Sequence, residues 1–230
     1  TMKQGFAMPT KLVALSHLTE LKGIRRTGDT LVIGAGATHA DVERSGDVKS
    51  AIPSLAALAA QIGDPQVRHR GTLGGSVAHA DPAADYPAAL VALNTSIETN
   101  ERTIPVDQFF TGLFETALEP TEIVKAVHFP VPKKAAYAKF PNPASLYAIA
   151  GVFVAQLADG SVRVAVTGAA TSVFRVEAME KALAGDFSAS AIEGITVPSD
   201  GLTSEPDASA EYRAHLIGVM ARRAVTAANG

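Results

Sequence analysis

Hydrophobic residues along the first 130 positions recur at two spacings, one typical of strands and one typical of helices. The strand-like spacing falls at 11–15, 31–36, 96–99, 102–106 and 122–129. The helical spacing falls at 39–44, 54–62 and 82–93. Thr38 is a favourable N-cap for the first helix, Pro53 suits the first turn of the second, and Gly63 suits its end. The pattern predicts a mixture of short helices and short strands.

The pattern changes at 130–143, where four prolines and three lysines predict a linker. Two strands and two helices are expected beyond it, at 146–157, 161–168, 173–184 and 208–227. The two strands are joined by Asp159-Gly160, a strong hairpin turn. The last helix carries one apolar face, formed by Tyr212, Leu216, Val219 and Met220. We therefore expect an α+β chain with a domain boundary within 130–143, and a small antiparallel sheet with helices after it.

Composition excludes several classes of protein. The 230 residues are 47% hydrophobic, which suits a globular core and argues against disorder. With 20 basic and 23 acidic side chains the chain has no positive field to hold nucleic acid, and its apolar runs are too short for a transmembrane segment. The chain has no cysteine, so disulfides, thiolate nucleophiles and iron–sulfur ligation are excluded and redox chemistry would need an organic cofactor or a partner. No signal peptide is recognised, and a cytoplasmic location is expected.

The first candidate site is the turn Gly34-Ala-Gly36, which follows a predicted strand and precedes a predicted helix. A dinucleotide fingerprint would need Gly or Ala at His39 and an acidic residue at the end of a second parallel strand about 20 residues on. The sequence has neither, and 52–61 reads as helix. The pattern therefore favours a tight strand-to-helix turn over a Rossmann site.

The second candidate is the segment 70–87, which begins Arg-Gly-Thr-Leu-Gly-Gly-Ser. Two adjacent glycines, Gly74 and Gly75, allow a phosphate to approach the backbone, and consecutive N–H groups with the Thr72 and Ser76 hydroxyls would form an anion-binding concavity. The alternative is a plain Gly-Gly turn.

The segment resembles the second flavin-binding loop of a known family, and further matches run through most of the chain. They are Met2-Lys3-Gln4, Gly34 to Thr38, Arg70 to Ser76, Asp81 to Pro87, Glu122 to Val124, Tyr137 to Phe140 and Pro143 to Ser145. The chain is similar to the FAD-binding medium subunit of molybdenum hydroxylases, the family of carbon monoxide dehydrogenase and xanthine dehydrogenase. The resemblance implies an α+β, two-domain flavoprotein subunit, with a mixed-sheet FAD-binding domain at 1–130 followed by the smaller C-terminal domain at 134–230.

The implied function is electron transfer by an oxidoreductase subunit. Electrons from a large molybdopterin subunit would pass through a small iron–sulfur subunit to FAD and then to an external acceptor. No side chain of this chain would be catalytic, and the chain alone need not be active. Two alternatives remain: a flavin-free interaction module of the same complex, and a stand-alone FAD-dependent oxidoreductase.

The resemblance also implies site residues. Those expected to cradle the FAD diphosphate are Thr72, Leu73, Gly74, Gly75 and Ser76. Asp85 would accept hydrogen bonds from the ribityl and adenosine side, or alternatively cap a helix. Ile123 and Val124 would contact the adenine or the ring system through backbone and apolar atoms. Lys139 and Tyr147 would reach the isoalloxazine, unless they are an exposed cation and a core aromatic residue.

Two other readings of these side chains are weaker. His69, His79 and Asp81 lack a fourth ligand at metal-site spacing, so no metal is expected. Ser76, His79 and Asp85 lack the strand-turn-helix elbow of a hydrolase nucleophile, so a catalytic triad is rejected.

The sequence departs from the family at its start. Members carry an Ala-Gly-Gly loop, the first FAD loop, in an N-terminal stretch that the sequence does not contain, so a truncated form is expected. Each hydrogen bond to a charged group contributes about 1.5–3 kcal/mol, and two or three lost donors would weaken FAD binding by roughly 3–9 kcal/mol. FAD would then be weakly held or absent in this chain.

Overall fold

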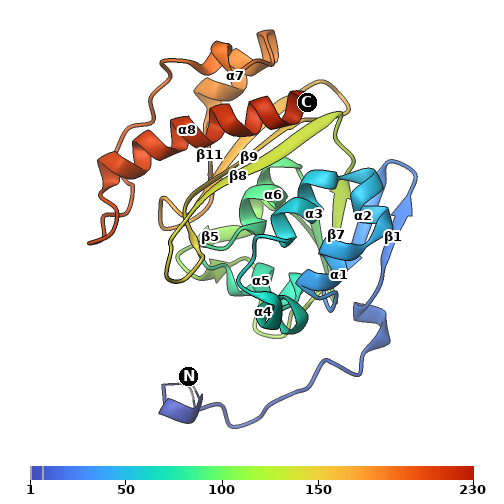
Figure 1. Cartoon of the computed structure of the whole chain (residues 1–230). Helices are drawn as coiled ribbons and strands as arrows, with labels where there is room; N and C mark the ends of the chain where they lie inside the picture. Colours follow the sequence, from blue (N-terminus) through green and yellow to red (C-terminus); the bar gives the residue numbers. More distant parts are fainter. Residues whose placement is uncertain (1, 7) are drawn as a thin grey trace.

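The computed structural model describes residues 2–6 and 8–230, which form a five-stranded sheet, a four-stranded sheet and a small two-stranded one, with helices between and outside the two larger sheets (Figure 1). The first sheet has five strands in the order β1-β2-β7-β3-β4. Its strands are β1 (Ile24–Thr27), β2 (Thr30–Gly34), β3 (Ser96–Thr99), β4 (Thr103–Pro105) and β7 (Val124–Pro130). A small hairpin, β5 (Phe110–Gly112) and β6 (Glu115–Thr116), lies between β4 and β7 in sequence. All pairings of these described strands are antiparallel.

Six short helices accompany this sheet, and polar caps define most of their starts. They are α1 (His39–Arg44), α2 (Gly46–Ala51), α3 (Pro53–Ala59), α4 (Pro65–Arg70), α5 (Leu73–His79) and α6 (Tyr86–Ala92). Thr38 forms a full capping box with Asp41, as its residue type predicted for the N-cap. Asp64 caps α4, whose first residue is a proline. Four short 3₁₀ turns lie at Met2–Gln4, Thr19–Leu21, Val106–Gln108 and Ser190–Ile192.

The second sheet has four antiparallel strands in the order β11-β10-β9-β8. They are β8 (Lys134–Pro141), β9 (Ala148–Gln156), β10 (Val162–Thr167) and β11 (Phe174–Arg175). The helices α7 (Glu177–Gly185) and α8 (Ala210–Asn229) cover its outer face, and α8 lies across β8 and β9 (Figure 1). The inner face meets α3 and α6.

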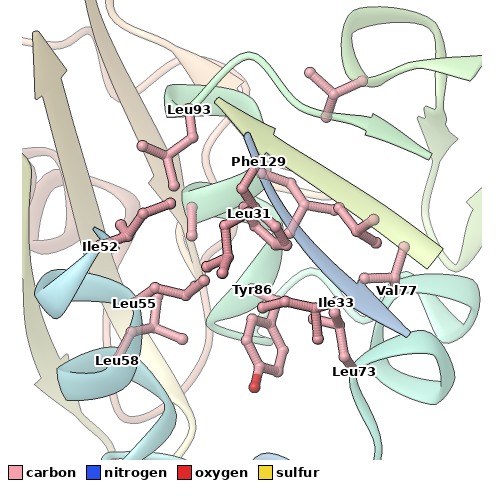
Figure 2. Packing of buried hydrophobic residues seen from close by; sticks show 14 of the residues in the cluster. Leu31, Ile33, Ile52, Leu55, Leu58, Leu73, Val77, Tyr86, Leu93 and Phe129 are labelled. Carbon is pink, nitrogen blue, oxygen red and sulfur yellow. The ribbon is translucent and has the colours of Figure 1, made fainter. Parts of the chain in front are cut away.

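Two hydrophobic clusters follow from this layering. The first lies between the five-stranded sheet and α1–α6, and Figure 2 shows Leu31 and Ile33 of β2 surrounded by side chains of the helices. Phe153 of β9 belongs to this first cluster, whereas its neighbour Val154 belongs to the second cluster beneath α7 and α8. Alternate residues of β9 therefore serve opposite cores, as the period of a strand requires.

Several sequence predictions are confirmed. The two-domain α+β class holds, and α1 has the predicted bounds. The hairpin of β3 and β4 is present, as is the turn at Asp159-Gly160, where Gly160 has a φ of +92°. On α8 Leu216 and Met220 are buried as predicted, whereas Tyr212 of the same face is 42% exposed.

Other predictions are wrong. The first sheet is antiparallel and not mixed. The predicted strand at 11–15 pairs with no other described segment, and Val13 is 81% exposed, because apolar residues form a strand only beside another strand. The predicted linker at 130–143 is mostly strand β8, whose one proline, Pro141, is its last residue.

Candidate functional site

The Gly-rich segment after α4 forms the start of helix α5 and not an open turn. Thr72 caps this helix, and its Oγ1 accepts the Gly75 N–H at 3.1 Å. A β-bridge joins Thr72 to Thr38, the cap of α1. Gly74 lies so close to Ala35 that an added Cβ would overlap the alanine side chain. Gly74 therefore lets α5 pack against the turn after β2, a role the sequence did not indicate.

The N–H groups of this segment are used within the protein. Those of Leu73 and Gly74 donate to carbonyl oxygens of the turn before α1, each at 2.9 Å, and that of Gly75 donates to the Thr72 hydroxyl. The expectation of a row of free N–H groups for a phosphate is therefore wrong for these three residues. Between residues 71 and 76, the polar residues that line an adjacent cavity are Thr72 and Ser76.

Two cavities meet at this helix. The Tyr147 cleft has a volume of ≈ 470 Å³, and its walls include His39, Ser76, Asp85 and Tyr147. The Ile123 cleft has a volume of ≈ 650 Å³ and is lined by Lys22, Gly36, Leu118, Ile123 and Val124, among others. The two clefts share Arg70, Thr72 and Gly75. The two clefts thus share a wall that carries one cation, Arg70, and one hydroxyl, Thr72.

Asp85 lies at the wall of the Tyr147 cleft in a buried cluster with Tyr137 and Lys139. Its Oδ1 accepts the Tyr137 hydroxyl at 2.5 Å, and its Oδ2 pairs with Lys139 Nζ at 2.9 Å. The side chains of the ion pair are 5% and 2% exposed. Burial raises the pKa of Asp85, while the charge of Lys139 and the Tyr137 hydrogen bond lower it. Burial and the Asp85 charge raise the pKa of Tyr137 well above its ordinary value.

This cluster decides between the readings of Asp85 and Lys139. Asp85 makes no capping hydrogen bond to α6, which excludes the capping alternative. Lys139 is not an exposed cation, because it donates to Asp85 and to the Gln61 carbonyl at 3.2 Å. Tyr137 was missed as a cluster member because its partner lies 52 positions away in sequence. Its place beside Lys139, in a segment that resembles the family, was the available indication.

Tyr147 and its neighbour form an exposed rim at the mouth of the Tyr147 cleft. Tyr147 is 49% exposed, which excludes the reading as a core aromatic residue. Burial and nearby aspartates raise its pKa. Leu146 beside it has a φ of +62° and is 39% exposed. A branched residue held in the left-handed region is uncommon, so this loop has a defined conformation.

Ile123 and Val124 both line the Ile123 cleft. Both backbone groups of Ile123 bond to Asn100: its N–H donates to Oδ1 at 2.7 Å, and its carbonyl accepts the Asn100 N–H at 3.2 Å. Glu122 beside them accepts two hydrogen bonds from Arg102, at 2.9 and 3.0 Å. Arg102 lowers the pKa of Glu122 to about 2. The Arg102–Glu122 ion pair and the hydrogen bonds of Asn100 thus hold the loop that carries Ile123.

His39 belongs to the site although the sequence singled it out only as a misfit to the Rossmann fingerprint. It is the first residue of α1, is 5% exposed, and lines the Tyr147 cleft. Burial and the charge of Arg68 lower its pKa to about 4, so the imidazole is neutral at physiological pH.

The alternative chemistries find no support in the residues that the structure describes. In that part of the chain no group of three or more His, Asp or Glu is arranged to hold a metal ion. His79 packs on Phe114, with ring centroids 5.1 Å apart, and the Asp85 carboxylate is bonded to Tyr137 and Lys139, so the rejected triad does not form. None of the described helices is long and apolar enough to cross a bilayer.

Comparison with known families divides the chain in two. Residues 1–132 match the FAD binding domain in molybdopterin dehydrogenase, and residues 135–228 match the CO dehydrogenase flavoprotein C-terminal domain. The carbon monoxide dehydrogenase medium chain of Hydrogenophaga pseudoflava is 34% identical over 99% of this chain and 84% of its own length. The nicotine 6-hydroxylase medium subunit of Paenarthrobacter nicotinovorans is also 34% identical, over 99% and 85%.

A solved structure agrees with these sequence matches. A crystal structure of the Cu,Mo-CO dehydrogenase contains a chain that superposes with a TM-score of 0.86 at 32% identity, covering 99% of this chain and 85% of that one. Both the sequence and the arrangement of sheets and helices thus agree over nearly the whole chain. The chain therefore belongs to the family of FAD-binding medium subunits of molybdenum hydroxylases.

Proposed function

We propose that this chain holds FAD across the Tyr147 and Ile123 clefts and serves as the electron-transferring subunit of a molybdenum hydroxylase. Its partners would be a large molybdopterin subunit and a small iron–sulfur subunit. A cytoplasmic location and domains at 1–130 and 134–230 are part of this proposal. When bound, FAD would accept electrons from the iron–sulfur partner and deliver them to an external acceptor.

The observation that carries the binding proposal is the junction of the two clefts. FAD consists of two flat ring systems joined by a ribityl chain and a diphosphate, so it needs two spaces joined by a polar wall. The clefts, ≈ 470 and ≈ 650 Å³, meet at Arg70, Thr72 and Gly75. Arg70 supplies a cation and Thr72 a hydroxyl for the diphosphate, which fits the group even though the nearby N–H groups are used elsewhere.

The other predicted residues would act from the walls. Ile123 and Val124 would contact one ring system through apolar atoms, and Tyr147 would cover the other from the C-terminal domain. Asp85 and Lys139 form an ion pair with each other, so we assign them to holding the wall of the Tyr147 cleft in place. Any contact of Asp85 with the ribityl chain would use its remaining lone pairs.

Titration of the purified chain with FAD, followed by quenching of flavin fluorescence, tests the proposal. Arg70→Gln should weaken FAD binding by about ten-fold, since a hydrogen bond to a charged group contributes about 1.5 kcal/mol or more. The same substitution should leave riboflavin binding unchanged, because riboflavin has no phosphate. Arg25→Gln, on an exposed strand outside both clefts, is the matched control. No quenching of FAD at tens of micromolar would exclude the proposal for the chain alone.

A further inference from the structure

One polar side chain of the Tyr147 cleft has no task in the fold. His39 is 5% exposed, and its Nδ1 is buried without a hydrogen-bond partner among the described residues. Its ring packs against the ring of Tyr86, with centroids 5.4 Å apart. A buried polar atom without a partner destabilises a protein, so an apolar side chain would serve packing better at this position.

The surroundings of His39 keep space around the imidazole. Gly71 lies beside it on the cleft wall, and an added Cβ at Gly71 would come within 2.5 Å of His39 Nε2. The Gly71 carbonyl accepts the backbone N–H of His39 at 3.0 Å, and this bond holds the start of α1 against the cleft. The backbone thus places the ring at the cleft wall, while its Nδ1 has no hydrogen-bond partner among the described residues.

Burial and a neighbouring cation also act on the charge of the ring. Burial and Arg68 lower the pKa of His39 to about 4, so above pH 5 the imidazole carries one N–H donor and one lone-pair acceptor. A neutral donor–acceptor pair matches the edge of a nitrogen heterocycle, where ring nitrogens alternate with N–H, NH₂ or carbonyl groups. A cation would be expected instead if the partner were a phosphate.

We propose that His39 is a flavin-binding residue, whose imidazole hydrogen-bonds the polar edge of the FAD ring system that occupies the Tyr147 cleft. The inference rests on the proposed function and deepens it. Adenine and isoalloxazine share the required edge chemistry, and AMP and riboflavin as separate probes distinguish them.

Three variants separate a binding role from a packing role. His39→Leu removes both nitrogens. His39→Asn places an amide near the Nδ1 position, and His39→Gln places one near Nε2. His39→Leu should weaken FAD binding by about three- to ten-fold, the range expected for one neutral hydrogen bond, and one of the two amide variants should stay within about two-fold of wild type. The same loss of affinity should appear when His39→Leu is titrated with AMP or with riboflavin, but not with both.

Thermal unfolding without flavin supplies a second readout. If Nδ1 is unpaired, His39→Leu should have a melting temperature equal to or above that of wild type. The control His215→Leu, on the exposed side of α8, should change neither quantity. Equal FAD affinity of wild type and His39→Leu overturns the inference while the proposed function stands. A marked fall in melting temperature with equal affinity losses in all three variants assigns His39 to packing and also overturns it. Failure of the wild type to bind FAD refutes both.

Discussion

The ion pair between Lys139 and Asp85 allows a quantitative prediction. Lys139→Met keeps the length of the side chain but leaves a buried carboxylate without its cation. The atoms are 2.9 Å apart, which corresponds to about 6 kcal/mol of attraction at an effective dielectric constant of about 20. Desolvation offsets part of this attraction, and breaking such a buried pair on one side typically costs about 3–5 kcal/mol.

Urea and thermal unfolding monitored by circular dichroism measure this cost. For a chain of this size the melting temperature should fall by roughly 6–20 °C. The double variant Asp85→Asn with Lys139→Met removes both charges and should recover a large part of the loss. The matched control is Lys125→Met, which breaks a 3.1 Å pair with Glu98 whose side chains are 36% and 32% exposed, and should cost less than about 1 kcal/mol.

The pH dependence of the same variant has a definite sign. Burial already raises the pKa of Asp85, and Lys139 lowers it, so loss of the lysine raises the pKa further. A carboxyl whose folded pKa exceeds its unfolded value loses stability as pH rises. The destabilisation by Lys139→Met should therefore be larger at pH 8 than at pH 5. A cost no greater than that of Lys125→Met at both pH values would refute the reasoning.

Three further predictions concern single positions. Gly74→Val should lower the free energy of unfolding in urea by about 1–3 kcal/mol, because a Cβ at position 74 would lie 2.9 Å from backbone atoms of Ala35. The control Gly218→Ala on α8 should not destabilise the protein, because position 218 has space for a methyl group. Arg102→Met should lower the urea midpoint at pH 7 and converge with wild type near pH 2, because the pKa of Glu122 lies at about 2 and its stabilisation is lost as pH falls through that value. Tyr147→Ala should leave the melting temperature unchanged, since the side chain is 49% exposed, but weaken flavin binding in the fluorescence titration; unchanged affinity would remove Tyr147 from the site.

Sequence patterns predicted the local parts of this structure well. Thr38 determines the start of α1 through contacts three residues away, and Asp159-Gly160 determines a turn within four residues. Features that depend on residues far away in the sequence were not predicted. The predicted strand at 11–15 has the right residues but no neighbouring strand, and Gly74 is needed because Ala35 packs against it.

The candidate site shows the same division. Resemblance assigned Thr72 and Ser76 to the FAD diphosphate and Tyr147 to the isoalloxazine, and all three line the Tyr147 cleft. Whether a side chain is free for a ligand is a tertiary property, so the sequence did not reveal that Lys139 is neutralised by Asp85 or that His39 has an unpaired nitrogen.

The strand β9 bears on how the two halves of the chain can be separated. Eight of its nine residues are buried, with Phe153 facing one core and Val154 the other. A gene cut between β7 and β8 would leave α3 and α6 without the sheet that covers them, and would expose the inner face of that sheet to water. The boundary between the two matched families thus falls within a region where residues of both pack in one hydrophobic cluster. We therefore expect residues 1–132, produced alone, to be less stable than the whole chain in urea unfolding.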